Sequence, residues 1–309
     1  MASPILHIKD SYYFEVPKFL WRQNYSRLDQ VPEFLVKRHP HATLDEFNEA
    51  LAGKILIPQP FGTLKNLYEK ESGFAISRFM LLEVLVAVVL TFIFVRLAGR
   101  MRSGERPKGK LWNLFEAMLV YVRDQIARPA IGHHDADRFL PLLWTIFFFI
   151  LGCNLLGLVP WAGSPTAAFG VTLALAGVTF LTVLAAGMHR FGPIGFWLNQ
   201  VPHMDLPWYM RPLKLLILAI EILGLCIRHG VLAVRLLANM VAGHLVLLGI
   251  MGLAFSAEAA LSPKWYIVAP ISILGSTLFS CLELFVAVLQ AYIFTFLSAL
   301  FIGSAVHHH

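Results

Sequence analysis

Apolar and polar positions form long separate blocks along this chain of 309 residues. Met80–Ala98, Phe139–Pro160 and Ala167–Met188 are each nearly uncharged over about 20 residues, the length that a helix needs to cross the hydrocarbon core of a bilayer. Two further apolar blocks, Leu213–Phe255 and Ile267–Ile302, are about twice as long. The pattern predicts an all-α polytopic membrane protein with about five membrane-crossing helices.

Each of the two long blocks is expected to form one strongly tilted helix. About 43 helical residues would extend about 65 Å, roughly twice the hydrocarbon thickness. A hairpin would need a turn signal near its middle, yet no proline lies between Leu213 and Ser262, and the interior glycines are scattered. We therefore expect a continuous helix over about 213–255, tilted by roughly 60° from the membrane normal. The segment 267–302 has no proline after Pro270 and is expected to lie antiparallel to it.

A shorter segment, 111–128, is periodic in a different way, with apolar residues recurring at intervals of three and four and polar residues on the other side. Its apolar positions are Leu111, Leu114, Phe115, Met118, Leu119, Val122 and Ile126. This pattern predicts an amphipathic helix that lies on the cytoplasmic surface and stops at Pro129.

Residues 1–78 form a polar N-terminal extension that carries several aromatic residues and short possible helices such as Leu44–Leu51. Its first 75 residues contain no short apolar core with a cleavage site, so no processed targeting signal is expected. The membrane domain is placed at 79–306. Between its third and fourth blocks, Pro193, Pro202, Pro207 and Pro212 predict an irregular connection.

Composition agrees with a membrane location, because 57% of the residues are hydrophobic and only 14% are charged, against about a quarter in soluble domains. The net charge of +6 does not indicate nucleic-acid binding, since the basic residues cluster beside the apolar blocks, where they set orientation. The loop Trp161–Thr166 is uncharged, whereas the first and third connections are basic. This predicts an external N-terminus and a cytoplasmic C-terminus. The basic residues are Arg96, Arg100, Arg102, Arg106, Lys108 and Lys110 after the first block, and Arg190, Arg211 and Lys214 after the third.

Motifs for disulfides, metals and nucleotides are weak in this sequence. The three cysteines lie within apolar blocks and are interpreted as small packing residues. The segment Gly132-His133-His134-Asp135-Ala-Asp137 has metal-ligand residue types but lies in a short turn, and we expect no metal there. No glycine-rich phosphate-binding pattern is present, so neither a nucleotide site nor another cofactor is expected.

Ionisable and amide residues inside the two long blocks are the most informative feature. Glu221, Arg228 and Arg235 are spaced by sevens and form one stripe along a helix, with Asn239 one turn further on. The other block has its own series of sevens, Ser276, Glu283 and Gln290. A charge at mid-membrane costs at least about 2.5–3.5 kcal/mol, so it persists only where it faces a partner or water.

Several of these residues also have a structural interpretation. Arg228, with His229 beside it, could be a residue whose charge extends to water near the wet end of a tilted helix. Glu283 could be a structural acid paired with His244 or an arginine, and Asn239 and Gln290 could simply join helices by hydrogen bonds. Arg235 has no acid nearby on its own helix, so we expect another chain to supply its partner.

Four motifs now point to a known family. Arg235-Leu-Leu-Ala-Asn239-Met-Val-Ala-Gly243-His244 resembles the signature of ATP synthase subunit a, whose arginine faces the rotor. Leu289-Gln290-Ala-Tyr-Ile-Phe-Thr-Phe-Leu297 is similar to the last-helix motif of that family, and Asn154-Leu-Leu-Gly-Leu-Val-Pro160 to an earlier one. The segment ending Val122-Arg-Asp-Gln-Ile-Ala-Arg-Pro129 also fits. The resemblance covers about residues 75–306 in the family's order.

The resemblance implies a proton-translocating stator subunit of an F-type ATP synthase, not catalytic by itself, in a bacterial-type inner membrane. The implied partners are a rotor ring of small carboxylate-bearing proteolipids, the peripheral-stalk subunit b, the rest of the complex and lipid. Arg235 would be the rotor-facing charge. Many bacterial relatives carry an acid at the position of His244 and a histidine at that of Glu283, and this chain has the two exchanged. The implied proton path comprises His244, Glu283, Glu221, Asn239, Gln290 and Ser276.

Two other functions fit the sequence less well. A secondary transporter could use Arg235 to bind an anionic substrate, but such proteins usually contain two related halves with interrupted helices, and no internal repeat is seen. An intramembrane metalloenzyme would need closely spaced ligands such as His-Glu-x-x-His, which the sequence lacks. The identity of the ion, H⁺ or Na⁺, would be set on the ring rather than on this chain.

Overall fold

The computed structural model of the chain describes residues 10–17, 21, 25–38, 40–102, 109–159, 162–199, 211–255 and 265–307. Within these ranges, five helices are long and apolar enough to cross a membrane. The predicted fold class, an all-α polytopic membrane protein, is confirmed. The five helices are α3 (Arg78–Arg102), α6 (Ala136–Gly157), α7 (Phe169–Phe191), α9 (Arg211–Phe255) and α11 (Trp265–Val306).

The N-terminal extension is a small structured unit. The helix expected at Leu44–Leu51 is α2, which starts with a capping box between Thr43 and Glu46. Its apolar face forms a core with α1 (Glu33–Arg38) in which Val31, Leu35, Phe47 and Leu51 are buried. The sequence did not predict the strands, which pair as two antiparallel hairpins. They are β1 (Tyr13–Glu15) with β2 (Lys54–Leu56), and β3 (Gly62–Asn66) with β4 (Glu69–Gly73).

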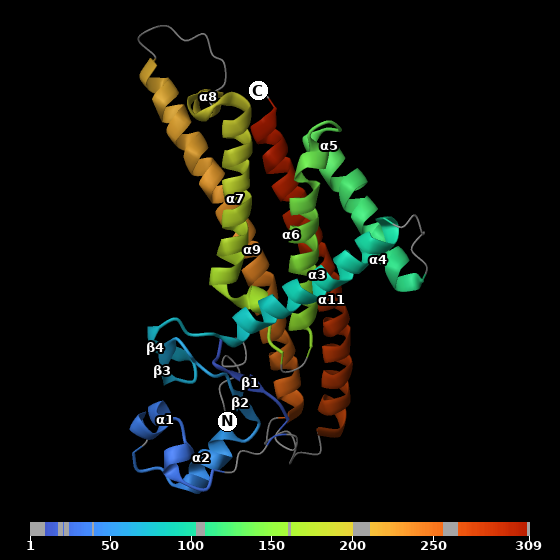
Figure 1. Cartoon of the computed structure of the whole chain (residues 1–309). Coiled ribbons are helices and arrows are strands. Elements are labelled where there is room, and N and C mark those ends of the chain that lie inside the picture. The colour runs from blue at the N-terminus through green and yellow to red at the C-terminus, as the bar shows by residue number, and fades with distance from the viewer. Residues whose placement is uncertain are drawn as a thin grey trace.

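The N-terminal extension and the C-terminus lie at opposite ends of the helix bundle. Figure 1 shows the extension at the same end as the connection between α6 and α7, and the C-terminus at the opposite end. The C-terminal end of α7 and the short helices α5 and α8 also lie at this opposite end, whereas α3 runs obliquely and ends at the side of the bundle. The basic connection that follows α7 therefore begins at the end of the bundle opposite the extension, and the connection between α6 and α7 lies at the end that carries the extension.

The predicted surface helix is longer and less uniform than expected. It consists of α4 (Lys110–Tyr121), a π-helical stretch η3 (Val122–Ala127) and α5 (Arg128–Ile131). The expected stop at Pro129 is wrong, because Pro129 lies in the first turn of α5, where the missing N–H costs least. The chain turns instead at Gly132, whose φ of 95° suits a glycine. Val122, Ile126, Ala127 and Ile131 are fully buried, and η3 and α5 pack against α6 and α11.

The connection after α7 forms the short helix α8 (Pro193–Asn199), which begins at one of the prolines expected to make it irregular. Gly187 of α7 leaves room for the ring of Phe196, because a Cβ at this glycine would collide with that ring. Phe196 is thereby buried against α7. The other prolines of this connection lie outside the described residues, except Pro212 in the first turn of α9.

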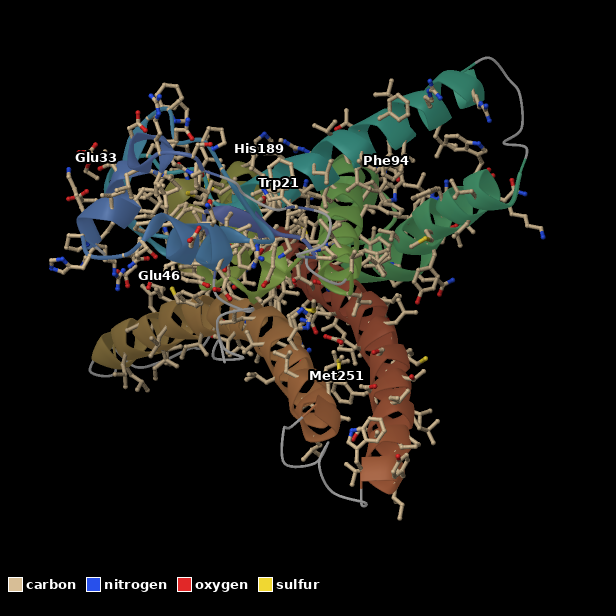
Figure 2. All side chains as sticks on the ribbon, turned by 90° about the horizontal axis from the view of Figure 1, so that it is seen from below. Trp21, Glu33, Glu46, Phe94, His189 and Met251 are labelled. Carbon is tan, nitrogen blue, oxygen red and sulfur yellow. The ribbon has the colours of Figure 1, made fainter. Side chains whose placement is uncertain are left out.

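The last two membrane helices are continuous, as predicted. The 45 residues of α9 correspond to about 68 Å of helix and show no reversal at Gly230. Helix α11 has 42 residues and begins before Pro270, so it extends beyond the expected 267–302 at both ends. Figure 1 shows α9 and α11 antiparallel and in contact, and Figure 2 shows that the end of α9 near Met251 extends away from the other helices together with the start of α11. Their tilt relative to the membrane stays a prediction.

Candidate functional site

Arg235 lies in the middle of α9 with its side chain half-buried. Within the described residues its guanidinium takes part in no ion pair or hydrogen bond, although α11 and α7 both pack against α9. Beside it the surface of α9 has a shallow hollow of about 420 Å³ with an entirely apolar lining apart from the arginine. The hollow is lined by Ile227, Gly230, Val231, Val234 and Arg235. An unpaired guanidinium thus borders an open apolar surface.

One turn after Arg235, an amide pair joins α9 to α11. Asn239 Nδ2 donates to Gln290 Oε1 at 2.8 Å. Gln290 is only 1% exposed, and its Nε2 has no hydrogen-bond partner within the described part of the chain. The amide of Gln290 is therefore held by one hydrogen bond and keeps a free donor inside the helix pair.

A second pair lies further along the same interface. His244 Nδ1 is 2.8 Å from Glu283 Oε1, and Glu283 is buried at 6% exposure. The close approach depends on Gly243, because a Cβ there would lie 2.7 Å from Glu283 Oε1. An imidazole and a carboxyl group at this distance share a hydrogen bond in which either can hold the proton.

These residues form a line along the interface between α9 and α11. The order Arg235, Asn239, His244 follows α9 toward its C-terminus, and the order Gln290, Glu283 follows α11 toward its N-terminus. Both directions lead to the end of the bundle that carries the extension (Figure 1). The polar line therefore connects the position of Arg235 with that end.

Glu221 and Ser276 lie apart from the two pairs. Glu221 accepts a hydrogen bond from Arg228 at 2.7 Å, and both side chains are partly exposed. Glu221 is 14 residues before Arg235, about 21 Å along the helix in the direction opposite to His244. Ser276 lies one heptad beyond Glu283, and its hydroxyl donates to the carbonyl of Ile273 on its own helix.

A buried polar residue of the motif that ends at Pro160, Asn154, joins α6 to this interface. Asn154 Nδ2 donates to the carbonyl of Ala287 at 3.2 Å, and its Oδ1 accepts from Thr166 Oγ1 at 2.8 Å. Ala287 lies between Glu283 and Gln290 on α11. The sequence could have indicated this contact, because an amide inside an apolar block needs a hydrogen-bond partner in the membrane interior.

His229 is placed differently from the neighbouring Arg228. Its side chain is 4% exposed and lies between the rings of Phe180 and Phe301, 5.2 and 4.9 Å away between centroids. Nδ1 lies 2.9 Å from the carbonyl oxygen of Leu225, and Nε2 has no partner among the described residues. The interpretation that grouped His229 with Arg228 at a wet helix end is wrong for the histidine, because consecutive residues face different sides of a helix.

The described residues contain no group of three or more His, Cys, Asp or Glu side chains that could hold a metal ion. Cys153 is buried, whereas Cys226 and Cys281 are exposed on the long helices, and none of the three forms a disulfide. The described site offers a fixed positive charge, hydrogen-bonding amides and one acid–imidazole pair.

Comparison with known proteins agrees with the motifs. The family model described as ATP synthase A chain matches residues 80–303. A protein of Anaeromyxobacter sp. strain Fw109-5 named ATP synthase subunit a is 36% identical over 303 residues, which cover 98% of this chain and 70% of that protein. The ATP synthase subunit a of Chloroherpeton thalassium is 38% identical over 87% of this chain and 79% of its own length.

A third relative is more similar over a shorter region. The ATP synthase subunit a of Anaeromyxobacter dehalogenans strain 2CP-1 is 45% identical over 206 residues, 66% of this chain and 50% of that protein. The alignment with the first relative extends into the N-terminal extension, which the four motifs do not reach. With a family model matching well over half of its length and five helices able to cross a membrane, the chain is an integral membrane protein that belongs to the ATP synthase A chain family.

Proposed function

We propose that the chain is the proton-translocating stator subunit of an F-type ATP synthase and that the fixed charge of Arg235 makes the carboxyl groups of a rotor ring release their protons. The observation that carries the proposal is the unpaired, half-buried guanidinium beside the apolar hollow on α9. A helix of a small proteolipid would cover the hollow and bring its carboxyl group to the arginine. The arginine would then have the partner that α9 and α11 do not supply.

The role of Arg235 follows from the chemistry of guanidinium. Its pKa is too high for it to lose a proton in a protein, so it cannot relay protons itself. It can favour the ionised form of an arriving carboxyl group, which then releases its proton. The same fixed charge repels protons that would otherwise pass directly between the two sides. Proton movement would then require rotation of the ring, and ATP would be made elsewhere in the complex, with this chain itself non-catalytic.

Two access routes would lead to the ring on opposite sides of Arg235. The first follows the polar line through Asn239–Gln290 and His244–Glu283 to the end that carries the extension. The second would pass Glu221 and Arg228, which lie on the other side of Arg235 along α9. The resemblance implied a path that contains Glu221 together with His244 and Glu283. Glu221 is assigned to the second route because it lies about 21 Å along α9 from Arg235 in the direction opposite to His244.

The charge distribution supports an orientation. Arg96, Arg100 and Lys110 give the first connection a basic character. Arg190 and Lys214 flank the third connection, at the end of the bundle opposite the extension. Under the positive-inside rule this end faces the cytoplasm, so the extension lies outside a bacterial-type inner membrane. The route past His244 and Glu283 is then the outer half-channel. The peripheral-stalk subunit b and the rest of the complex complete the proposed partners.

Disulfide cross-linking tests whether the hollow faces the ring. Val231 and Val234 are exposed side chains in the hollow. In a background with Cys226 and Cys281 replaced by alanine, Val231→Cys or Val234→Cys should cross-link under mild oxidation to a cysteine next to the ring carboxylate. The expected product is a covalent adduct of this chain and one proteolipid subunit.

The matched control is Val88→Cys on α3, which is at least as exposed in the described structure. It should give no adduct, because α3 is not expected to face the ring. Equal cross-linking from α3, or no cross-linking from either position in the hollow of an assembled complex, would contradict the proposed rotor face.

A further inference from the structure

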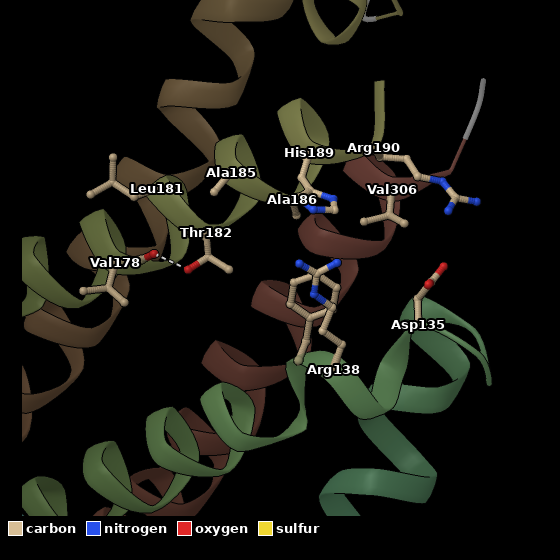
Figure 3. A pocket seen from close by; sticks show the side chains of 11 residues that line it. Asp135, Arg138, Val178, Leu181, Thr182, Ala185, Ala186, His189, Arg190 and Val306 are labelled. Carbon is tan, nitrogen blue, oxygen red and sulfur yellow. Dashed lines mark hydrogen bonds between the residues drawn. The ribbon is translucent and has the colours of Figure 1, made fainter. Parts of the chain in front are cut away.

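A cavity of about 660 Å³ opens at the end of the bundle that carries the C-terminus. It lies between the start of α6, the last turns of α7 and Val306 at the end of α11. Figure 3 shows the side chains that line it, with Arg138 of α6 rising toward His189 of α7 and Arg190 further out. This volume is in the range of sites that bind small molecules.

The polar part of the cavity carries excess positive charge. Among the described residues, neither the guanidinium of Arg138 nor that of Arg190 takes part in an ion pair or hydrogen bond. Asp135 is the acid that lines the same cavity, and His189 adds an imidazole to the lining. The cavity thus has one net positive charge with a neutral histidine and two with a protonated one. Two unpaired guanidinium groups near one opening favour an anion with several oxygen atoms.

The other part of the cavity is apolar and continues down α7. Val178 and Leu181 line it and are exposed on a helix of membrane-spanning length. The hydroxyl of Thr182, between them and the rim, donates to the carbonyl of Val178 and is not free for a ligand. A soluble anion would use only the charged rim. A molecule with an anionic head and apolar chains would use both parts, as lipids do in basic pockets between membrane helices.

We propose that this cavity binds an anionic phospholipid, with its phosphate between Arg138 and Arg190 and its acyl chains along Val178 and Leu181. The bound lipid would join α6, α7 and the C-terminal end of α11 at the membrane surface. The proposal does not depend on the proposed proton path, because none of these residues belongs to the line along α9 and α11.

Lipid titration of the purified, delipidated full chain tests the proposal through the thermal midpoint of unfolding. A phosphatidylglycerol should raise the midpoint, whereas a phosphatidylcholine with the same acyl chains and free glycerol phosphate should not. Arg138→Gln together with Arg190→Gln should weaken phosphatidylglycerol binding about thirtyfold, and each single change about fivefold.

Two further variants separate a built site from general attraction to an anionic surface. Ala185→Trp fills the cavity without changing its charge and should also abolish the phosphatidylglycerol effect. Arg96→Gln removes a guanidinium that stacks on Phe92 of α3 outside the cavity and should bind like the wild type. Equal stabilisation by phosphatidylcholine or by glycerol phosphate would overturn the proposal. So would unchanged binding in the double variant, or a loss in Arg96→Gln as large as in the double variant.

Discussion

His244 on α9 and Glu283 on α11 face each other across antiparallel helices, with Nδ1 of the imidazole 2.8 Å from Oε1 of the carboxyl group. The pair can hold one proton in two ways, as imidazolium with carboxylate or as neutral imidazole with carboxylic acid. An imidazole exchanges protons near neutral pH, so the pair suits a proton route. The sequence analysis left open whether Glu283 pairs with His244 or with an arginine, and the structure has it beside His244. The role of the pair in proton transfer stays a proposal.

Exchanging the two residues tests whether they work as a pair. His244→Glu alone places two acids together, and Glu283→His alone places two imidazoles together, so each should reduce ATP-driven proton pumping in inverted vesicles. The double exchange restores one acid and one imidazole and should pump more than either single variant. A double variant no better than the combined effect of the singles would show that the residues are not coupled.

Gly243 should be needed for the geometry of this pair. In Gly243→Ala the new Cβ would lie 2.7 Å from Glu283 Oε1, so the carboxyl group has to move away from His244 or the helices have to separate. Overpacking of this kind costs about 1–3 kcal/mol, and proton pumping should fall. Gly249→Ala is the matched control, because no atom lies within 4 Å of its added Cβ. If both variants pump equally, the close approach at Gly243 has no functional role.

Replacing the two amides Asn239 and Gln290 by leucine should change the thermal stability of the chain in a non-additive way. Asn239→Leu or Gln290→Leu alone leaves the remaining amide without its partner inside the helix pair, which should cost about 1–3 kcal/mol. The double leucine variant removes both polar groups and should be more stable than either single variant. The measurement is the thermal midpoint of the purified chain, and strictly additive losses would contradict direct pairing.

The orientation can be tested by cysteine labelling with a reagent that does not cross the membrane, in a background without Cys226 and Cys281. Ala50→Cys in the extension should react from outside. Gly104→Cys, in the basic first connection outside the described residues, should react only after the cytoplasmic side is opened. The reverse pattern would overturn the assignment made from the basic connections.

Much of the membrane domain could be predicted because the bilayer imposes simple rules. Lengths of apolar blocks determine where helices can span, and the absence of a turn signal in Leu213–Phe255 predicted one helix. Glu283 and Gln290, seven residues apart on α11, pair with His244 and Asn239, which are five residues apart on the antiparallel α9. The pairing of Glu221 with Arg228 was harder to foresee, because side chains seven residues apart on a helix are separated by two turns. The long arginine side chain spans this distance.

The features that the sequence analysis predicted wrongly or not at all have local causes. Strands β3 and β4 are short and mostly polar, so they lack the alternation that marks a half-buried strand. Pro129 was taken as a stop signal, but the π-helical stretch before it allows the helix to continue for another half turn. His229 was grouped with its charged neighbour, whereas packing between Phe180 and Phe301 decides its place.

Arg235 should not be replaceable by another cation. Lysine carries a compact charge without the planar fork and can lose its proton when it is desolvated against a proteolipid helix. Arg235→Lys should therefore support little or no proton-driven ATP synthesis while the chain remains assembled. Synthesis close to wild type in this variant would show that a positive charge alone is sufficient.

ATP synthesis by membrane vesicles carrying Arg235→Ala tests the central claim most directly. The control Lys214→Ala removes an exposed positive charge from the same helix and should keep full synthesis, with assembly of both variants checked by co-purification of the complex. We expect the assembled Arg235→Ala complex to make no ATP from a proton gradient and to leak protons between the joined half-channels. Substantial coupled ATP synthesis in that assembled complex would contradict the claim that Arg235 is the functional centre.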